Sequence, residues 1–120
     1  MVMERDMESI RKLLIDLKEQ KPGFSLTSKN EETDYYMYLL TEGGLIEATR
    51  HKTLSKQVTS YHNIKITFAG HDFIDVAEDD NIWNKTQEKA MEKGWSMSNI
   101  PLTVLTDLLK TTLYQHLSSD

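Results

Sequence analysis

The order of apolar and polar residues predicts an α+β domain, in which two helices precede a β-hairpin and further helices follow it. Three observations support this class. Residues 35–48, YYMYLLTEGGLIEA, change from helical to extended spacing at a double glycine. Residues 61–68 alternate polar and apolar side chains, as a half-buried strand does. Residues 100–117 return to helical spacing, so a helix is expected near the end of the chain.

The length of 120 residues favours a single domain over residues 1–120. We divide it into a helix–helix–hairpin core, residues 1–68, and a helical extension, residues 69–120. Cysteine is absent, which excludes disulfides and thiolate ligands to metals. The charged N-terminus lacks the apolar segment of a signal peptide, and no apolar run approaches the roughly 20 residues that span a bilayer. We therefore expect a cytoplasmic protein.

A first helix is expected over residues 6–19, with Asp6 as its N-cap and Pro22-Gly23 soon after its end. Residues 23–30, GFSLTSKN, alternate only briefly and indicate a short strand or an extended link. The core face of the helix would hold apolar residues at helical spacing: Met7, Ile10, Leu14 and Leu17.

A second helix is expected over residues 31–42, because Asn30 is a favourable N-cap and acidic residues follow it. Met37 and Leu40 would face the core. Gly43 or Gly44 would supply the left-handed residue that ends the helix. The next residues, LIEAT, predict a strand.

A basic segment then connects the two predicted strands. Residues 49–67 hold four Lys or Arg and no acid, although the whole chain has a net charge of −5. We expect residues 50–63 to form most of a long loop, and loops of over ten residues are often functional. If it binds nucleic acid, each phosphate contact contributes about −0.9 to the salt slope. A solvated loop that merely lacks acids explains the same pattern. The candidate nucleic-acid-binding residues are Arg50, His51, Lys52, Lys56, His62 and Lys65.

Three further helices are expected in the extension. The first starts after a Thr67 cap, the second ends at Gly94, and the third opens at Ile100-Pro101 with Asn99 as its cap. The inward residues of the first two are predicted as Phe68, Phe73, Ile74, Val76, Ala77, Ile82, Trp83, Ala90 and Met91.

The last helix is apolar over much of its circumference, which requires cover on more than one side. We expect a homodimer through this helix, with burial inside one chain as the alternative. Leu105, Leu109 and Leu113 are the candidate contact residues, on a stripe that Leu102 and Leu117 extend.

The span YYMYLLTEGGLIEA resembles the winged-helix pattern, in which a helix enters a wing through a glycine turn. ERDMESIRKLL, ITFAGHDFIDVAEDDNIWNK and IPLTVLTDLLKTTL extend the similarity to the small bacterial and prophage proteins grouped as domain of unknown function 2513. The resemblance implies a winged helix-turn-helix-like domain with a β-hairpin wing and additional C-terminal helices. It also implies a phage or prophage context, but it does not indicate an activity.

The second helix offers a different kind of surface. Its exposed face would carry four acids, which repel DNA phosphates. Tyr35, Tyr38 and Glu42 on this face suit a protein partner instead, because tyrosine combines a large contact area with a polar tip. Two functions therefore remain open: a DNA-associated regulator that uses the basic wing, and a protein-binding module that blocks a host factor.

Enzymatic function is not expected. The serines lack a Gly-x-Ser-x-Gly setting and the chain has no glycine-rich phosphate loop, so neither a serine nucleophile nor a nucleotide cofactor is predicted. His71 and Asp75 share a helix face, but two ligands are too few for a metal site.

Overall fold

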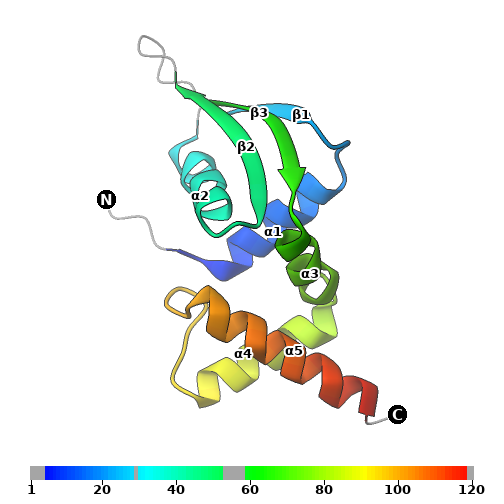
Figure 1. Cartoon of the computed structure of the whole chain (residues 1–120). Helices are drawn as coiled ribbons and strands as arrows, with labels where there is room; N and C mark the ends of the chain where they lie inside the picture. The colour runs from blue at the N-terminus through cyan, green and yellow to red at the C-terminus, as the bar shows by residue number, and fades with distance from the viewer. Residues whose placement is uncertain (1–4, 29, 53–58, 119–120) are drawn as a thin grey trace.

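The computed structural model describes residues 5–28, 30–52 and 59–118. These residues form five helices and one three-stranded antiparallel sheet, which confirms the α+β class (Figure 1). The elements in chain order are α1 (Met7–Lys18), β1 (Phe24–Ser28), α2 (Glu31–Glu42), β2 (Ile46–Lys52), β3 (Thr59–Ile66), α3 (Phe68–Ala77), α4 (Asp80–Glu92) and α5 (Leu102–Ser118).

The sheet contains one strand more than the expected hairpin. Its strand order is β1-β3-β2, because residues 24–28 pair with β3 as a true strand. Phe24 and Leu26 of β1 pack against the core, which the short polar alternation in the sequence only hinted at. The register of both strand pairs shifts near Asn63, whose φ of 54° is left-handed, a conformation that Asn tolerates better than most residues.

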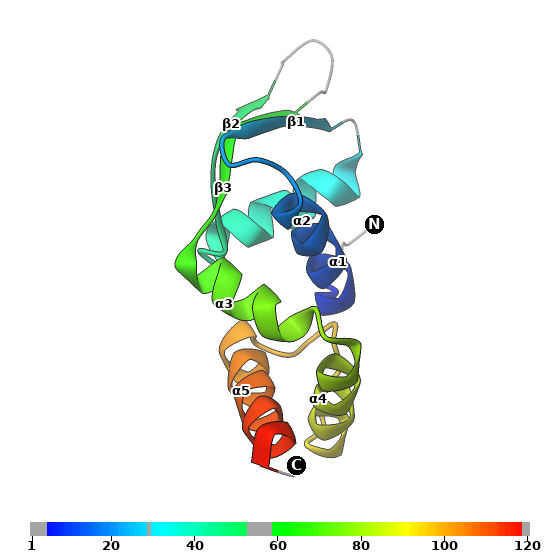
Figure 2. The same cartoon turned by 90° about the vertical axis from the view of Figure 1, so that its right-hand side faces the viewer.

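Helices α1 and α2 cover one face of the sheet (Figure 2). Asp6, Asn30 and Thr67 accept hydrogen bonds from backbone N–H groups in the first turns of α1, α2 and α3, which confirms three of the four predicted N-caps. Most residues predicted to face the core in these three helices are buried: Met7, Ile10, Leu14, Leu17, Met37, Leu40, Phe73, Ile74 and Ala77.

Two glycines determine how α3 approaches the sheet. Gly44 has a φ of +75° and ends α2, as the double glycine predicted. A Cβ atom on Gly70 would lie 2.0 Å from the carbonyl oxygen of Leu45, so α3 can pack on the start of β2 only without a side chain there.

For description, we call α1, α2 and the sheet the sheet half, and α3, α4 and α5 the helical half. The molecule is elongated, with extents of 54 × 34 × 19 Å, and the β2–β3 hairpin and the C-terminal end lie at opposite ends (Figure 1). In the helical half, α4 and α5 pack against each other below α3 (Figure 2).

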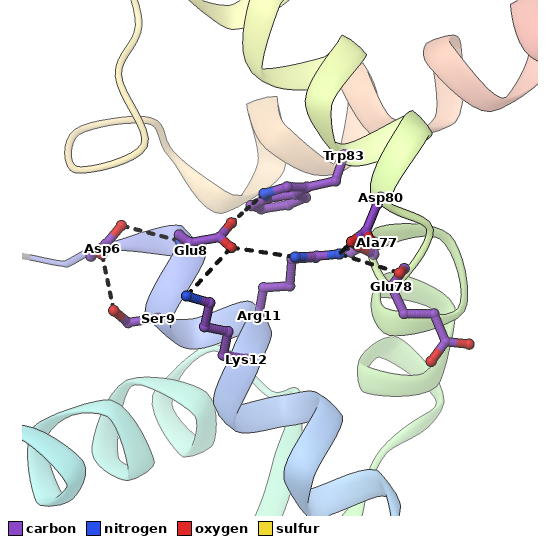
Figure 3. Close-up of polar contacts among 9 residues, drawn as sticks. All are labelled: Asp6, Glu8, Ser9, Arg11, Lys12, Ala77, Glu78, Asp80 and Trp83. Atoms are coloured by element: carbon purple, nitrogen blue, oxygen red, sulfur yellow. Dashed lines mark hydrogen bonds and ion pairs between the residues drawn. The ribbon is translucent and has the colours of Figure 1, made fainter.

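Arg11 of α1 connects the two halves (Figure 3). Its Nε atom donates to the carbonyl oxygen of Ala77 at 2.5 Å, and Nη2 donates to Glu78 O at 3.2 Å and to Asp80 Oδ1 at 2.6 Å. The guanidinium also lies 5.2 Å from the ring centre of Trp83, whose Nε1–H donates to Glu8. These contacts join α1 to the end of α3 and the start of α4.

Several sequence-based expectations are wrong in detail. Strand β2 continues to Lys52 and β3 starts at Thr59, so the strands replace much of the expected long loop; residues 53–58 lie outside the described chain. Phe68 and Met91, predicted to face inward, are 92% and 72% exposed. Both lie on otherwise amphipathic helices, where helical spacing does not fix the edges of the buried face.

The start of α5 also differs from the prediction. The first α5 hydrogen bond runs from Leu105 N to Pro101 O, so Pro101 precedes the helix. Asn99 does not cap it: its side-chain oxygen instead accepts a hydrogen bond from Ser96 N at 2.8 Å. This bond stabilises the preceding turn. Among the described residues, no helix is long and apolar enough to span a bilayer.

Candidate functional site: the hairpin and the exposed face of α2

The basic residues predicted for the hairpin do not form one surface. Side chains alternate between the two faces of a strand. On β2 and β3 the alternation places Arg50 and Lys52 toward α2, while His51, His62 and Lys65 lie on the opposite, uncovered face of the sheet. Lys56 lies outside the described residues.

Arg50 is held inside the molecule's own network instead of being free for phosphates. Its Nη2 atom lies 3.1 Å from Asp34 Oδ2, and its Nε atom lies 3.4 Å from Asp34 Oδ1 and 3.3 Å from the Tyr61 oxygen. The hydroxyl of Tyr61 donates to the Asp34 carboxylate and to the Asp34 backbone carbonyl, the latter at 3.2 Å. Tyr61 is only 1% exposed. The network therefore ties α2 to β2 and β3.

The electrostatics of this network keep both charges in place. Burial of the Asp34 carboxyl works to raise its pKa, but hydrogen bonds from Tyr61 and Arg50 outweigh burial, and the pKa stays below the ordinary value. Burial, together with the hydrogen bond to Asp34, raises the pKa of Tyr61 to about 12. At neutral pH the site is thus an ion pair with a neutral phenol donor.

The uncovered sheet face is polar and carries a histidine pair. The rings of His51 and His62 lie 5.5 Å apart at an angle of 68°, and Ser25 Oγ lies 3.3 Å from His62 Nδ1. Lys65 sits directly opposite Glu47 in the register of the two strands. This face therefore offers one lysine close to one acid, with imidazoles beside them.

The face of α2 that points away from the sheet matches the predicted acidic surface. Tyr38 is 48% exposed, and Glu31, Glu32 and Glu42 are also exposed. Tyr35 is half-buried, with its ring 5.6 Å from that of Tyr36. Tyr38 is therefore the aromatic residue of this face that is best placed to meet a partner.

This face ends at an apolar pocket that the sequence did not indicate. The pocket has a volume of about 150 Å³ and includes Glu42 on its wall. Arg5 also lines it; Arg5 Nη2 donates to Ile100 O at 2.6 Å, while Arg5 Nε is buried and has no hydrogen-bond partner among the described residues. The remaining lining residues are Met7, Ile10, Leu39, Leu40, Gly43, Leu45 and Leu102. They come from α1, α2 and α5, and no sequence signal connects such distant segments.

A larger groove of about 450 Å³ adjoins this pocket, since Gly43, Leu45 and Leu102 line both. It runs between α3 and α5. Its apolar walls include Phe73, Val76 and Leu109, and Asp72, Asp107 and Lys110 lie around it.

The candidate contact residues of α5 are distributed differently from the prediction. Leu105 and Leu109 are 0% and 2% exposed, so they pack within the chain, whereas Leu113 is half-buried. Among the described residues, no group of three or more His, Asp or Glu is arranged to hold a metal ion.

Comparison with known proteins gives a family but no activity. A family model described as "Hypothetical protein (DUF2513)" matches residues 4–96. A Haemophilus influenzae protein described as "Uncharacterized protein" is 26% identical over 123 residues, which cover 97% of this chain and 100% of that protein. No solved structure matches the chain significantly.

Proposed function

The chain belongs to the DUF2513 family, and we propose that it is a non-enzymatic protein-interaction module that binds its partner through the exposed face of α2. The observation that carries the proposal is the position of Tyr38, a half-exposed aromatic residue on an acidic helix face. An exposed tyrosine with neighbouring charges is typical of a binding hot spot and its rim.

The pocket beside Glu42 adds an anchoring site to this surface. Its apolar lining can receive one apolar side chain of a partner. Glu31 and Glu42 favour basic residues on either side of that anchor. The partner surface we propose is thus a segment with one apolar residue flanked by Lys or Arg.

A crosslinking experiment tests this proposal. A photoreactive phenylalanine placed at position 38 should capture a partner in a lysate of the source cell, and the same group at exposed Met91 of α4 should not. The purified partner should then lose at least tenfold in affinity for Tyr38→Ala or Glu42→Lys, as hot-spot residues do. A partner that binds both variants like the natural protein would contradict the proposed surface.

A second candidate function, nucleic-acid binding, is favoured by the hairpin itself. Strands β2 and β3 extend away from the helical half (Figure 1). Lys52 of β2 and Lys65 of β3 are exposed, and Lys56 follows β2 in the sequence, outside the described residues. Because Arg50 is paired with Asp34, at most three lysines remain for phosphates. The salt slope of duplex-DNA binding should therefore not exceed about −2.7 for one chain.

The nucleic-acid candidate is tested by measuring duplex binding between 50 and roughly 200 mM salt, the range over which phosphate contacts weaken strongly. Lys52→Glu/Lys65→Glu should abolish binding, and Lys85→Glu on α4 should not. If the natural protein does not bind duplex DNA at the lowest salt concentration, the nucleic-acid candidate is wrong and the α2 surface remains as the candidate site.

We extend the proposal to the fold type and setting. A winged-helix-like domain is supported by the Gly44 turn, through which α2 leads directly into the long β2–β3 hairpin. One helix, α2, lies between β1 and β2, whereas a helix-turn-helix places a second, recognition helix after the first. A hairpin wing without the two helices of a helix-turn-helix suits a protein-binding role better than recognition of DNA bases in the major groove. A cytoplasmic, prophage-type setting completes this proposal.

A further inference from the structure

We propose that two copies of the chain pair through the groove between α3 and α5, with their α5 helices antiparallel across a two-fold axis. The inference does not depend on the function proposed for α2. The groove adjoins the pocket beside Glu42, with which it shares Gly43, Leu45 and Leu102, but Tyr38 of the α2 face does not line it. The dimer is supported by the exposed face of α5, the groove and Phe68.

The exposed face of α5 carries apolar residues beyond the end of the groove. Thr103, Thr106 and Lys110 line the groove. With about 3.6 residues per turn, Leu113 and Leu117 continue the same face of the helix. Tyr114 lies beside them, and Tyr114 and Leu117 are 67% and 61% exposed. A face of this kind is usually covered by another surface.

A projecting aromatic residue lies beside this groove. Phe68, the first residue of α3, is 92% exposed, and it lies one helical turn before Asp72, which lines the groove. The groove has about 450 Å³ of space and apolar walls. A surface that bears both a projecting aromatic side chain and an apolar groove can match a second copy of itself, because a two-fold interface applies the same patch to both partners.

The charges on α5 favour the antiparallel arrangement. Asp107 and Lys110 are exposed, lie one turn apart and line the groove. A two-fold axis between them would set Lys110 of each copy against Asp107 of the other, and Thr103 against Tyr114. Each opposite-charge pair would then form twice. This self-complementarity of charge is the reason to assign a second copy to the groove.

The dimer would leave the two hairpins accessible. The β2–β3 hairpin lies at the opposite end of the molecule from the exposed end of α5 (Figure 1). Two copies joined through α5 would therefore present two hairpins pointing away from the junction, while the pocket at the end of each α2 would lie next to it.

Sedimentation equilibrium over a range of concentrations up to roughly 200 µM tests the proposal, since dimers of this kind form in the micromolar range or below. The expected mass is twice that of the 13.9 kDa chain. Lys110→Asp alone, and Asp107→Lys alone, should each weaken dimerisation about tenfold by placing like charges together. The double variant Asp107→Lys/Lys110→Asp should restore it, because the reciprocal pairs re-form.

Two further variants separate the dimer interface from folding. Phe68→Ser should weaken dimerisation while leaving the free energy of unfolding of the monomer nearly unchanged, because the side chain is almost fully exposed. Lys85→Asp on α4, away from the groove, should dimerise like the natural protein. A 13.9 kDa mass at every concentration, or a double swap that does not recover the dimer, would overturn the proposal.

Discussion

Two arginines stabilise the two halves of the molecule in different surroundings. Arg11 lies between the halves with a side chain that is 8% exposed, and it reaches backbone carbonyls as well as carboxylates. Arg50 lies within the sheet half with a side chain that is 42% exposed, and it reaches Asp34 and Tyr61. The two arginines should therefore contribute different free energies, because water screens the guanidinium of Arg50 more than that of Arg11.

The two networks stabilise different parts of the molecule. The end of α3 depends on Arg11, since the carbonyl oxygens of Ala77 and Glu78 accept its N–H groups. The hairpin depends mainly on Tyr61, whose buried ring and hydroxyl fix β3 against α2. Arg50 adds a charge that faces solvent on one side. The predictions below test this ranking.

The largest effect is expected for Arg11→Met. The methionine keeps apolar contact with Trp83, but the two carbonyls and the carboxylates of Glu8 and Asp80 lose their donor. Leaving the two carbonyl oxygens without their charged donor costs about 2 kcal/mol, so the free energy of unfolding in urea should fall by roughly that amount. Lys12→Met is the matched control, because Lys12 is 71% exposed on the same helix, and it should change stability little.

The same variant should uncouple the two halves. Trp83 and Trp95 are the two tryptophans of the chain, and both belong to the helical half or the turn after α4. Tryptophan fluorescence therefore reports the helical half and its junction with α1, while circular dichroism reports both halves. The natural protein should show one coincident transition, and Arg11→Met should show an earlier transition by fluorescence. Coincident transitions in the variant would mean that Arg11 does not couple the halves.

A smaller effect is expected for Tyr61→Phe, about 1.5 kcal/mol, because a buried hydrogen bond to a charged group is lost while the ring stays. The pH dependence provides a second readout. The raised pKa of Tyr61, about 12, means that its contribution is complete below pH 10 and is lost as the pH rises toward 12. The natural protein should therefore lose more stability than Tyr61→Phe over this range. Equal losses of stability in the two proteins would mean that a group other than Tyr61 causes the destabilisation at alkaline pH.

Asp34 should give a pH dependence of the opposite sign. Its pKa is lowered in the folded state, so its contribution is present above the unfolded value near 3.8 and is lost as the pH falls through the folded pKa. Asp34→Asn should flatten the acid side of the stability curve below about pH 4. Asp72→Asn, an exposed acid on α3, tests whether removal of any carboxylate has this effect.

The sequence predicted local structure well and long-range contacts poorly. Caps and glycine turns act over a few residues, so Asp6, Asn30, Thr67 and Gly44 could be read directly. The pairing of β1 with β3 joins residues far apart in the chain, and only the brief alternation of polar and apolar residues in residues 23–30 indicated a strand there. The exposure of Phe68 was also not predicted, because burial of its side chain depends on residues that are distant in the sequence.

The candidate site shows the limit most clearly at Arg50. A basic segment without acids predicts free cations, yet Asp34, from the preceding helix, lies beside Arg50 in the folded chain. Local charge counts cannot detect such a partner. The tyrosines of α2 were a better guide: Tyr38 is exposed as expected, because helical spacing alone separates it from buried Met37 and Leu40.

The smallest effect is expected for Arg50→Gln. The guanidinium is 42% exposed and Asp34 keeps its hydrogen bond from Tyr61, so the variant should lose only about 0.5 kcal/mol of unfolding free energy. This loss should shrink further in 1 M salt, where the Debye length is about 3 Å. Lys85→Gln, at an exposed position of α4, is the control and should show no loss at either salt concentration. A loss for Arg50→Gln as large as that for Arg11→Met would mean that solvent exposure does not separate the two networks, and that the hairpin is held to α2 chiefly by charge.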